Sequence, residues 1–269
     1  MEEQVKIVQQ YYDEDVEAEW ERLAKHPFEF ELTTRMMNRY IRPGDRVLDI
    51  GGGPGRYSLY FARRGCDVTL LDLSGENVAF AKVRAVQEGL PLNAYQCDAR
   101  EASRAVEDLF DHVFLMGPMY HLLEEADRVR TMEQALSLLK AGGMLYVSFI
   151  LLFSGVIYAM KYLPEMLLDQ AEHPFLADVV RDSSYRGPAF TQAHFISQRE
   201  ILPFLSRFPL EKLHLFGQEG ILSPCEETLL AQPEEVQSAW LSLAERLCER
   251  EELLSYSEHA MYIGRKHGR

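Results

Sequence analysis

The feature that most constrains this chain is a short apolar segment that runs directly into a glycine-rich turn. Residues 46–50 (RVLDI) predict a buried β-strand, and a helix is expected from about residue 56 to residue 64. The turn between them contains Gly51, Gly52, Gly53 and Gly55. Glycine is needed where a backbone must turn sharply and lie against a ligand, so this unit predicts a binding loop at the end of a strand.

Strands and helices continue to alternate after the glycine turn. Further strands are predicted at residues 67–72, 92–96, 112–116, 144–150, 210–216 and 260–263. Strands that alternate with helices form a mostly parallel sheet with helices on both faces. Such sheets bind ligands at the carboxyl ends of their strands, which is where the candidate polar residues of this chain fall.

The chain divides into four parts. Residues 1–40 predict an N-terminal helical lid, and residues 41–150 predict the α/β core that contains the glycine turn. Residues 151–205 are rich in Met, Phe, Tyr and Leu and interrupt the alternation, so they predict a cap inserted over the sheet edge. Residues 206–269 predict the C-terminal part of the core sheet.

The sequence of the glycine turn can be compared with three known patterns of glycine-rich binding loop. A dinucleotide loop requires Gly-x-Gly-x-x-Gly, and counting from Gly51 the third glycine is replaced by Arg56. A phosphate-binding P-loop ends in Gly-Lys-Ser/Thr, a triplet that the sequence does not contain. The pattern that fits is Asp-x-Gly-x-Gly-x-Gly beginning at Asp49. An acidic residue ahead of the glycines favours a ligand with an ammonium group over a phosphate.

The turn formed by Asp49 and its glycines is followed along the chain by four further motifs. Together, and in this order, they resemble the motifs of class I S-adenosylmethionine-dependent methyltransferases. The four further motifs are Asp72 after the second strand, Asp98 after the third, the segment 110–118 (FDHVFLMGP) and the turn 139–145 (LKAGGML). The resemblance covers about residues 40–150. It implies an α/β fold: a Rossmann-like, doubly wound, seven-stranded sheet, mostly parallel with an antiparallel last strand, plus a helical cap insertion. Residues 116–122 are similar to a bacterial small-molecule subgroup of the ubiquinone and menaquinone methyltransferase type.

The resemblance also implies the site and its cofactor. We expect S-adenosyl-L-methionine to bind, with S-adenosyl-L-homocysteine as product, at Asp49, Gly51, Gly52, Gly53, Gly55, Asp72, Leu73, Asp98, Ala99, Met116, Gly117 and Tyr12. In the family the acid at Asp72 holds the ribose hydroxyls and the acid at Asp98 meets the adenine. His121 and Tyr120 follow the fourth strand, where a substrate would reach the methyl group, and are the candidate catalytic residues. Gln218 and Glu219 follow the sixth strand and could face the same cavity.

Charge and composition narrow the partners. Lys and Arg number 28 and Asp and Glu number 42, a net charge of −14 that disfavours binding to nucleic-acid phosphates. The four cysteines are widely spaced and form no zinc-like cluster with histidine, which predicts no metal site and a reducing, cytoplasmic location. Residues 144–160 carry no charge but are short for a membrane span, so no membrane association is expected.

The predicted function is methyl transfer to a small molecule enclosed between the carboxyl edge of the sheet and the cap. The acceptor atom stays open, as does the oligomeric state, a homodimer included. Three alternatives remain: a methyltransferase acting on a peptide or RNA, a protein that binds the cofactor without turnover, and a nicotinamide oxidoreductase. Arg56 in place of the third glycine disfavours the last of these.

Overall fold

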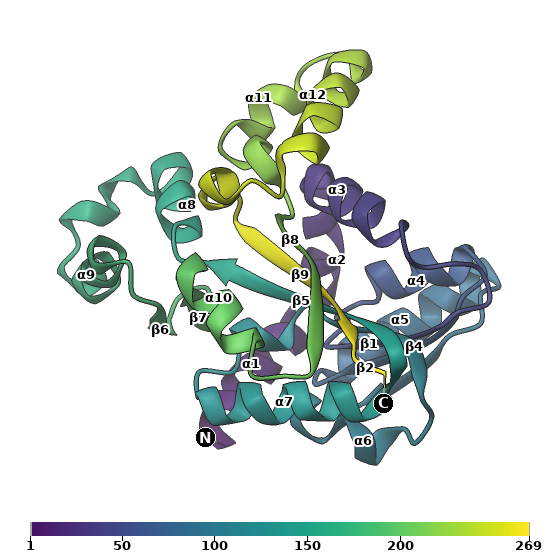
Figure 1. The fold of residues 1–269 in the computed structure, drawn as a ribbon. Coiled ribbons are helices and arrows are strands. Elements are labelled where there is room, and N and C mark those ends of the chain that lie inside the picture. The colour runs from purple at the N-terminus through teal and green to yellow at the C-terminus, as the bar shows by residue number, and fades with distance from the viewer. Residues whose placement is uncertain (1, 269) are drawn as a thin grey trace.

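A computed structural model describes residues 2–268 as a central sheet covered by helices (Figure 1). The strands are β1 (Arg46–Ile50), β2 (Asp67–Asp72), β3 (Asn93–Gln96), β4 (Phe110–Leu115), β5 (Leu139–Leu151), β6 (Tyr185–Pro188), β7 (Gln192–Ile196), β8 (Leu210–Gly217) and β9 (His259–Lys266). The longer helices are α1 (Glu2–Glu14), α2 (Val16–Lys25), α3 (Pro27–Met37), α4 (Arg56–Arg63), α5 (Gly75–Glu88), α7 (Glu125–Leu138), α8 (Ser154–Tyr162), α9 (His173–Arg181), α10 (Gln198–Leu205) and α12 (Glu234–Leu247). Two shorter ones are α6 (Ala102–Ala105) and α11 (Glu226–Leu230).

Seven strands form the predicted doubly wound sheet, in the spatial order β3, β2, β1, β4, β5, β9, β8. The pairs between β3 and β5 are all parallel, whereas β9 is antiparallel to both β5 and β8. The predicted Rossmann-like arrangement with an antiparallel last strand is therefore confirmed. Because β9 runs backwards, its first residue, His259, lies beside Ile150 near the carboxyl end of β5.

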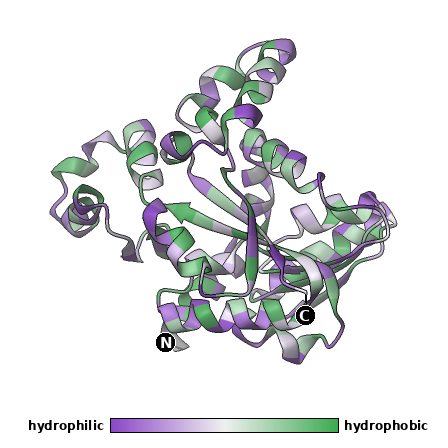
Figure 2. Ribbon diagram, in the orientation of Figure 1, coloured by the Kyte–Doolittle hydropathy of each residue, from purple (hydrophilic) through white to green (hydrophobic). Residues whose placement is uncertain are grey.

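Helices bury both faces of the sheet. Along β4, Val113 belongs to the core formed with α7 and α10, and the next residue, Phe114, belongs to the core formed with α3, α4 and α12. This alternation is the two-residue period of a strand that is covered on both sides. Figure 2 shows the outcome, a sheet whose central strands are mostly hydrophobic.

The segment 151–205 differs from a purely helical cap. It contains α8 and α9, but also the hairpin β6–β7, and β7 extends the sheet by pairing in parallel with Ile150 and Leu151 of β5. Gly187 and Pro188 obscure β6 in the sequence, because both residues are normally depleted in strands. Here β6 is an edge strand, the place in a sheet where proline is tolerated.

The uncharged stretch 144–160 is divided between two elements. Its first part lies in β5 and its last part in α8, which has only nine residues. Within residues 2–268, no helix combines the length and apolarity needed to cross a membrane.

The aromatic residue at the middle of the sheet provides a test of this packing. Phe114 is fully buried, with its ring 5.5 Å from that of Phe61 and 5.1 Å from that of Tyr146. We expect Phe114→Ala to lower the free energy of unfolding by about 3–5 kcal/mol, because it leaves a cavity between the sheet and α4. Urea unfolding measures this. Val86→Ala, at a side chain 80% exposed on α5, should change stability by less than about 0.5 kcal/mol. Equal effects of the two substitutions would contradict the packing.

Candidate active site

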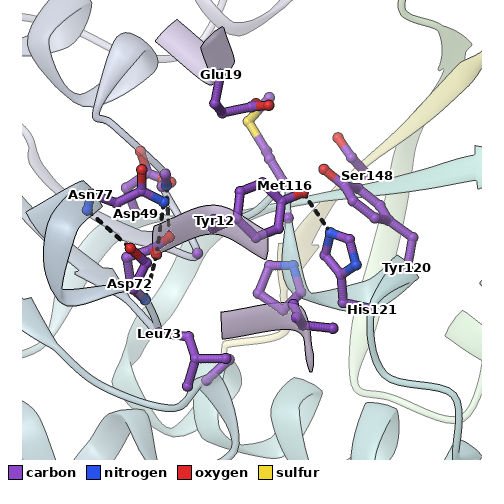
Figure 3. A pocket seen from close by; sticks show the side chains of 18 of the residues that line it. Tyr12, Glu19, Asp49, Asp72, Leu73, Asn77, Met116, Tyr120, His121 and Ser148 are labelled. Atoms are coloured by element: carbon purple, nitrogen blue, oxygen red, sulfur yellow. Dashed lines mark hydrogen bonds between the residues drawn. The ribbon is translucent and has the colours of Figure 1, made fainter. Parts of the chain in front are cut away.

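One large cavity opens at the carboxyl edge of the sheet, between the strand ends and the N-terminal helices (Figure 3). Thirteen of the fourteen predicted site residues line it: Tyr12, Asp49, Gly51, Gly52, Gly53, Asp72, Leu73, Asp98, Ala99, Met116, Gly117, Tyr120 and His121. They come from α1 and from the ends of β1, β2, β3 and β4. Segments that are up to about a hundred residues apart in the chain therefore meet at one site because parallel strands all end at the same edge.

The glycine turn has the close-packed geometry that its sequence predicts. Gly51 has φ +73°, and a Cβ atom at this position would lie 2.5 Å from Cδ of Pro118. On the other side of the turn, a Cβ atom at Gly117 would lie 2.7 Å from the Gly51 carbonyl oxygen. The loops after β1 and β4 are thus in contact, and any side chain at either glycine would force them apart.

Gly55 is the exception among the predicted cofactor residues, because it does not line the cavity. It is the N-cap of α4 with φ +87°, and a Cβ there would lie 3.0 Å from Cβ of Ala81. Its position shows a packing role, in which the lack of a side chain lets α5 approach the turn.

Asp49 is buried beneath the turn. Its Oδ2 accepts a hydrogen bond from Ser58 Oγ at 2.7 Å, and a Cβ at Gly52 would lie at the same distance from this oxygen. Burial raises the pKa of Asp49 to about 7, although the Ser58 hydrogen bond opposes the rise. A cation placed against this carboxylate would favour its charged form.

Asp72 connects the end of β2 to the glycine turn. Its Oδ2 accepts from the Gly53 backbone N–H at 2.8 Å, and its Oδ1 accepts from the Ser74 backbone N–H at 2.9 Å and from the Asn77 side chain at 3.2 Å. Burial raises the pKa of Asp72, while these three donors oppose the rise. The carboxylate is held rigidly at the cavity wall, where further lone pairs remain for ligand hydroxyl groups.

Asp98 has a partner that the sequence analysis did not anticipate. Both of its carboxylate oxygens bind the Arg100 guanidinium, with a shortest distance of 2.6 Å, and Arg100 continues to Asp127 at 3.0 Å. Burial alone would raise the pKa of Asp98, but the hydrogen bonds and charge of Arg100 outweigh it and lower the pKa. Asp98 therefore faces the cavity as one member of an ion-pair network.

His121 is held on both sides of its ring. Nδ1 lies 3.2 Å from the Gln192 carbonyl oxygen, and Nε2 lies 2.8 Å from the Tyr12 hydroxyl (Figure 3). A carbonyl only accepts, so the ring proton is on Nδ1, and Nε2 accepts from Tyr12. Burial lowers the pKa of His121 to about 4, which keeps the ring neutral at physiological pH. The histidine thereby joins the first helix to the loop after β4 and to β7.

Tyr120 precedes His121 and lines the cavity. Its ring lies 4.7 Å from that of His121 and 6.2 Å from that of His259. Burial raises its pKa well above the usual range, so the side chain is a neutral phenol. Its ring thus lies between His121, in the loop after β4, and His259 of β9.

Charged residues of the N-terminal helices close the cavity opposite the sheet. Arg22 of α2 binds Glu19 at 3.1 Å and Glu29 of α3 at 3.2 Å, and all three residues line the cavity. Glu29 is buried, and burial raises its pKa although Arg22 opposes the rise. The sequence analysis predicts a lid here but not these residues, because charges on amphipathic helices ordinarily face solvent.

A second polar group lies at the ends of β5, β8 and β9. Ser148 Oγ donates to Gln218 Oε1 at 2.7 Å, and His259 Nδ1 lies 2.7 Å from Glu219 Oε1. The other oxygen of Glu219 accepts from Ser257 Oγ and from the backbone N–H groups of Glu258 and His259. Burial would lower the pKa of His259, but Glu219 outweighs it and raises the pKa to about 9. The sequence analysis includes Gln218 and Glu219 as cavity candidates but misses His259 and Ser148.

Within the described residues, Glu29, Glu219 and His259 also form a group whose ligand atoms lie within 4.8 Å of one another, a spacing that a metal ion could bridge. Two observations favour proton chemistry over a metal here. Glu219 already accepts from four donors, and the Arg22 guanidinium lies beside Glu29. A metal cation at Glu219 would have to displace these donors, and the positive charge of Arg22 would repel it.

Comparison with known proteins finds similarity to methyltransferases. Residues 47–143 match a family model described as a methyltransferase domain. The chain is 30% identical, over 152 residues, to a ubiquinone biosynthesis O-methyltransferase of Aeromonas salmonicida; the match covers 54% of this chain and 63% of that protein.

Two solved structures show the same fold at low sequence identity. One is the N-methyltransferase NodS of Bradyrhizobium japonicum in complex with S-adenosyl-L-homocysteine, with a TM-score of 0.59, 13% identity and coverage of 97% and 98% of the two chains. The other is the 4+2 cyclase SpnF, with a TM-score of 0.56, 20% identity and coverage of 93% and 84%. These structures show the fold, and the family model over residues 47–143 and the curated relatives support the predicted class, the class I S-adenosylmethionine-dependent methyltransferases.

The hydrogen bonds of His121 lead to a spectroscopic prediction. Since the pKa of about 4 lies below the ordinary value of about 6.5, the ring should stay neutral from roughly pH 5.5 to pH 8. Long-range proton–nitrogen spectra should show one protonated and one bare ring nitrogen over this range, assigned by their loss in His121→Asn. Tyr12→Phe should shift the bare nitrogen because it loses its donor. A titration midpoint near the ordinary value would contradict the enclosed geometry.

Proposed function

We propose that this chain transfers the methyl group of S-adenosylmethionine to a small-molecule acceptor bound in the same cavity. The observation that carries the proposal is the division of one cavity into two chemically distinct halves. The ends of β1, β2, β3 and β4 contribute a glycine turn and three carboxylates, and the ends of β5, β8 and β9 contribute a histidine, a serine and an amide.

The first half fits the cofactor. Gly53 has open space where a side chain would be, and Asp49 and Asp72 are buried acids that hydrogen-bond to the protein but form no ion pair among residues 2–268. When bound here, S-adenosylmethionine would supply an electrophilic methyl group on sulfonium to the acceptor atom, with S-adenosylhomocysteine as the leaving group. We assign Asp72 to the ribose hydroxyls, Asp98 and Ala99 to the adenine side, and Gly51, Gly52, Gly53 and Met116 to the backbone walls.

The second half supplies a charged hydrogen-bond donor for the acceptor. Nδ1 of His259 is bound to Glu219, so Nε2 is the ring atom that remains for the cavity. We assign His259, whose raised pKa of about 9 keeps its ring protonated at neutral pH, to donate a hydrogen bond from Nε2 to the acceptor oxygen, which binds as the anion after releasing its proton to solvent. Glu219 is the positioning residue that orients the ring. The relative named as an O-methyltransferase supports an oxygen acceptor.

His121 and Tyr120 take supporting roles in this proposal. His121 is neutral and its free lone pair is already occupied by Tyr12, so neither ring nitrogen is left to bind the acceptor. The pair Tyr12–His121 closes the cavity between α1 and the loop after β4, which excludes water from the reacting atoms.

A small acceptor fits the way in which the cavity is covered. Val5, Val8, Gln9 and Tyr12 of α1 and Arg22 of α2 lie over the strand ends, whereas no residue of 151–205 lines the cavity. The acceptor is therefore enclosed by the N-terminal helices, with the 151–205 segment behind His121, and not directly by the predicted cap. This cover and the net charge of −14 disfavour RNA, and a cytoplasmic location is proposed on the same sequence grounds as before.

Cofactor binding is the first test. Calorimetric titration with S-adenosylmethionine and S-adenosylhomocysteine should give binding, and titration with NADH should give none. Asp72→Ala should weaken binding by about 1–3 kcal/mol, because the ligand hydroxyls lose a charged acceptor. The matched control is Asp67→Ala, an exposed aspartate at the other end of the same strand, which should bind as the wild type does. Binding of NADH alone, or equal affinity in both variants, would overturn the assignment.

The role of His259 has a separate test. Turnover is measured with methyl-labelled cofactor across a panel of small phenols, alcohols and carboxylic acids. His259→Gln should lower turnover about 100-fold or more while leaving cofactor affinity unchanged. The control is His214→Gln, since His214 is also bound through Nδ1 to a glutamate, Glu249, at 2.7 Å but lies outside the cavity. Equal turnover in the His259 variant and the wild type would remove His259 from the reaction.

A further inference from the structure

A second cavity lies away from the cofactor site, between α7, β7 and α10. Its polar lining includes Arg128 of α7 and His194 of β7, both almost completely buried, at 3% and 2% exposed. Neither residue takes part in the chemistry proposed above, and buried groups of this kind ordinarily have partners.

Arg128 is a buried cation that makes no ion pair among the described residues. Its Nη1 donates to the carbonyl oxygens of Leu122 and Leu123. Burial lowers the pKa of Arg128 to about 10 and the nearby Arg186 adds to the effect, although the charges of Glu125, Glu124 and Glu200 oppose it. Since a buried charge is costly unless it is paired, this guanidinium is a ready partner for an anion.

His194 is a buried histidine without a hydrogen bond. Among residues 2–268 neither Nδ1 nor Nε2 has a partner, although both atoms are inaccessible to bulk solvent. Burial, with Arg128 and Arg186 adding to it, lowers the pKa of His194 to about 3. The neutral ring keeps one N–H donor, and an anion beside it would satisfy that donor.

The other charged residues of the cavity are already engaged. Arg207 binds Glu125 at 2.8 Å, and Arg199 binds Asp182 at 2.9 Å. Glu200 accepts from the Ser184 backbone N–H. Arg128 and His194 are therefore the groups that a ligand would satisfy.

We infer that this cavity binds a small carboxylic acid with an apolar body, its carboxylate against Arg128 and His194. A guanidinium can bind a carboxylate through two parallel hydrogen bonds, and Nε and Nη2 of Arg128 are not used elsewhere. The remaining wall is apolar, formed by Phe149, Ile196 and Phe204. A bare inorganic ion would leave these apolar side chains uncovered. An aromatic or branched aliphatic acid would occupy both the polar part of the cavity and its apolar part.

The site lies directly behind the active-site loop. The carbonyl groups that Arg128 holds belong to the two residues after His121, and His194 is two residues from Gln192, whose carbonyl binds the His121 ring. The inference does not rest on methyl transfer, since it concerns a cavity that shares no lining residue with the cofactor site.

Titration of the whole protein with benzoate, with inorganic phosphate as the comparison, tests the inference. Benzoate should bind, and Arg128→Gln and His194→Leu should each weaken binding about tenfold or more, the loss expected when a charge-assisted hydrogen bond is removed. Arg130→Gln, an exposed arginine on the same helix, and His259→Gln, in the cofactor cavity, should bind benzoate as the wild type does.

Because a variant at a buried arginine can fail to fold, the ring nitrogens of His194 in the wild-type protein give an independent readout. Benzoate should shift these signals and raise the pKa of His194. Absence of benzoate binding, binding that is lost in His259→Gln, or preference for phosphate over benzoate would each overturn the assignment.

Discussion

The hydrogen bonds that join the glycine turn to the end of β2 are the constraint on which the site depends. The Gly51 backbone N–H donates to the Leu71 carbonyl at 2.7 Å, and two residues later Gly53 donates to the Asp72 carboxylate at 2.8 Å. The turn can follow this path only with glycine, since Gly51 and Gly53 both have positive φ. One consequence is that the carboxylate of β2 and the backbone of the turn form one rigid wall.

The cavity that this wall borders is stabilised less than its hydrogen bonds suggest. Asp49, Asp72 and Glu29 are buried acids whose pKa values burial raises. An acid with a raised pKa in the folded state lowers stability as the pH rises from its ordinary value toward the folded value, because the unfolded chain ionises first. For Asp49 this window extends from about pH 4 to about pH 7. The protein thus keeps acids at positions where their negative charge weakens the fold. This arrangement fits a ligand whose sulfonium and ammonium groups would stabilise that charge.

Local patterns explain which parts of this structure are predictable from sequence. The strands and the glycine turn follow from residues adjacent in the chain, and the parallel arrangement then brings Asp49, Asp72 and Met116 to one edge without further information. The hairpin β6–β7 is hidden by Gly187 and Pro188, and its pairing with β5 is a tertiary contact. The partner of Asp98 is two residues away, but an Asp-x-Arg spacing is too common to predict an ion pair.

His259 illustrates why the second half of the cavity escapes sequence analysis. It lies 40 positions from Glu219, and its strand resembles any apolar strand near a C-terminus. A rule that searches the residues after each strand would miss it, because β9 is antiparallel and brings its first residue to the carboxyl edge. The first half of the site is built on the glycine turn that the sequence predicts, and folds of this kind carry unrelated reactions, as the cyclase with the same fold shows. The proposed chemistry therefore rests on the half that the antiparallel strand supplies, since among the described residues a titratable ring faces the cavity with an oriented carboxylate behind it only at His259 and Glu219.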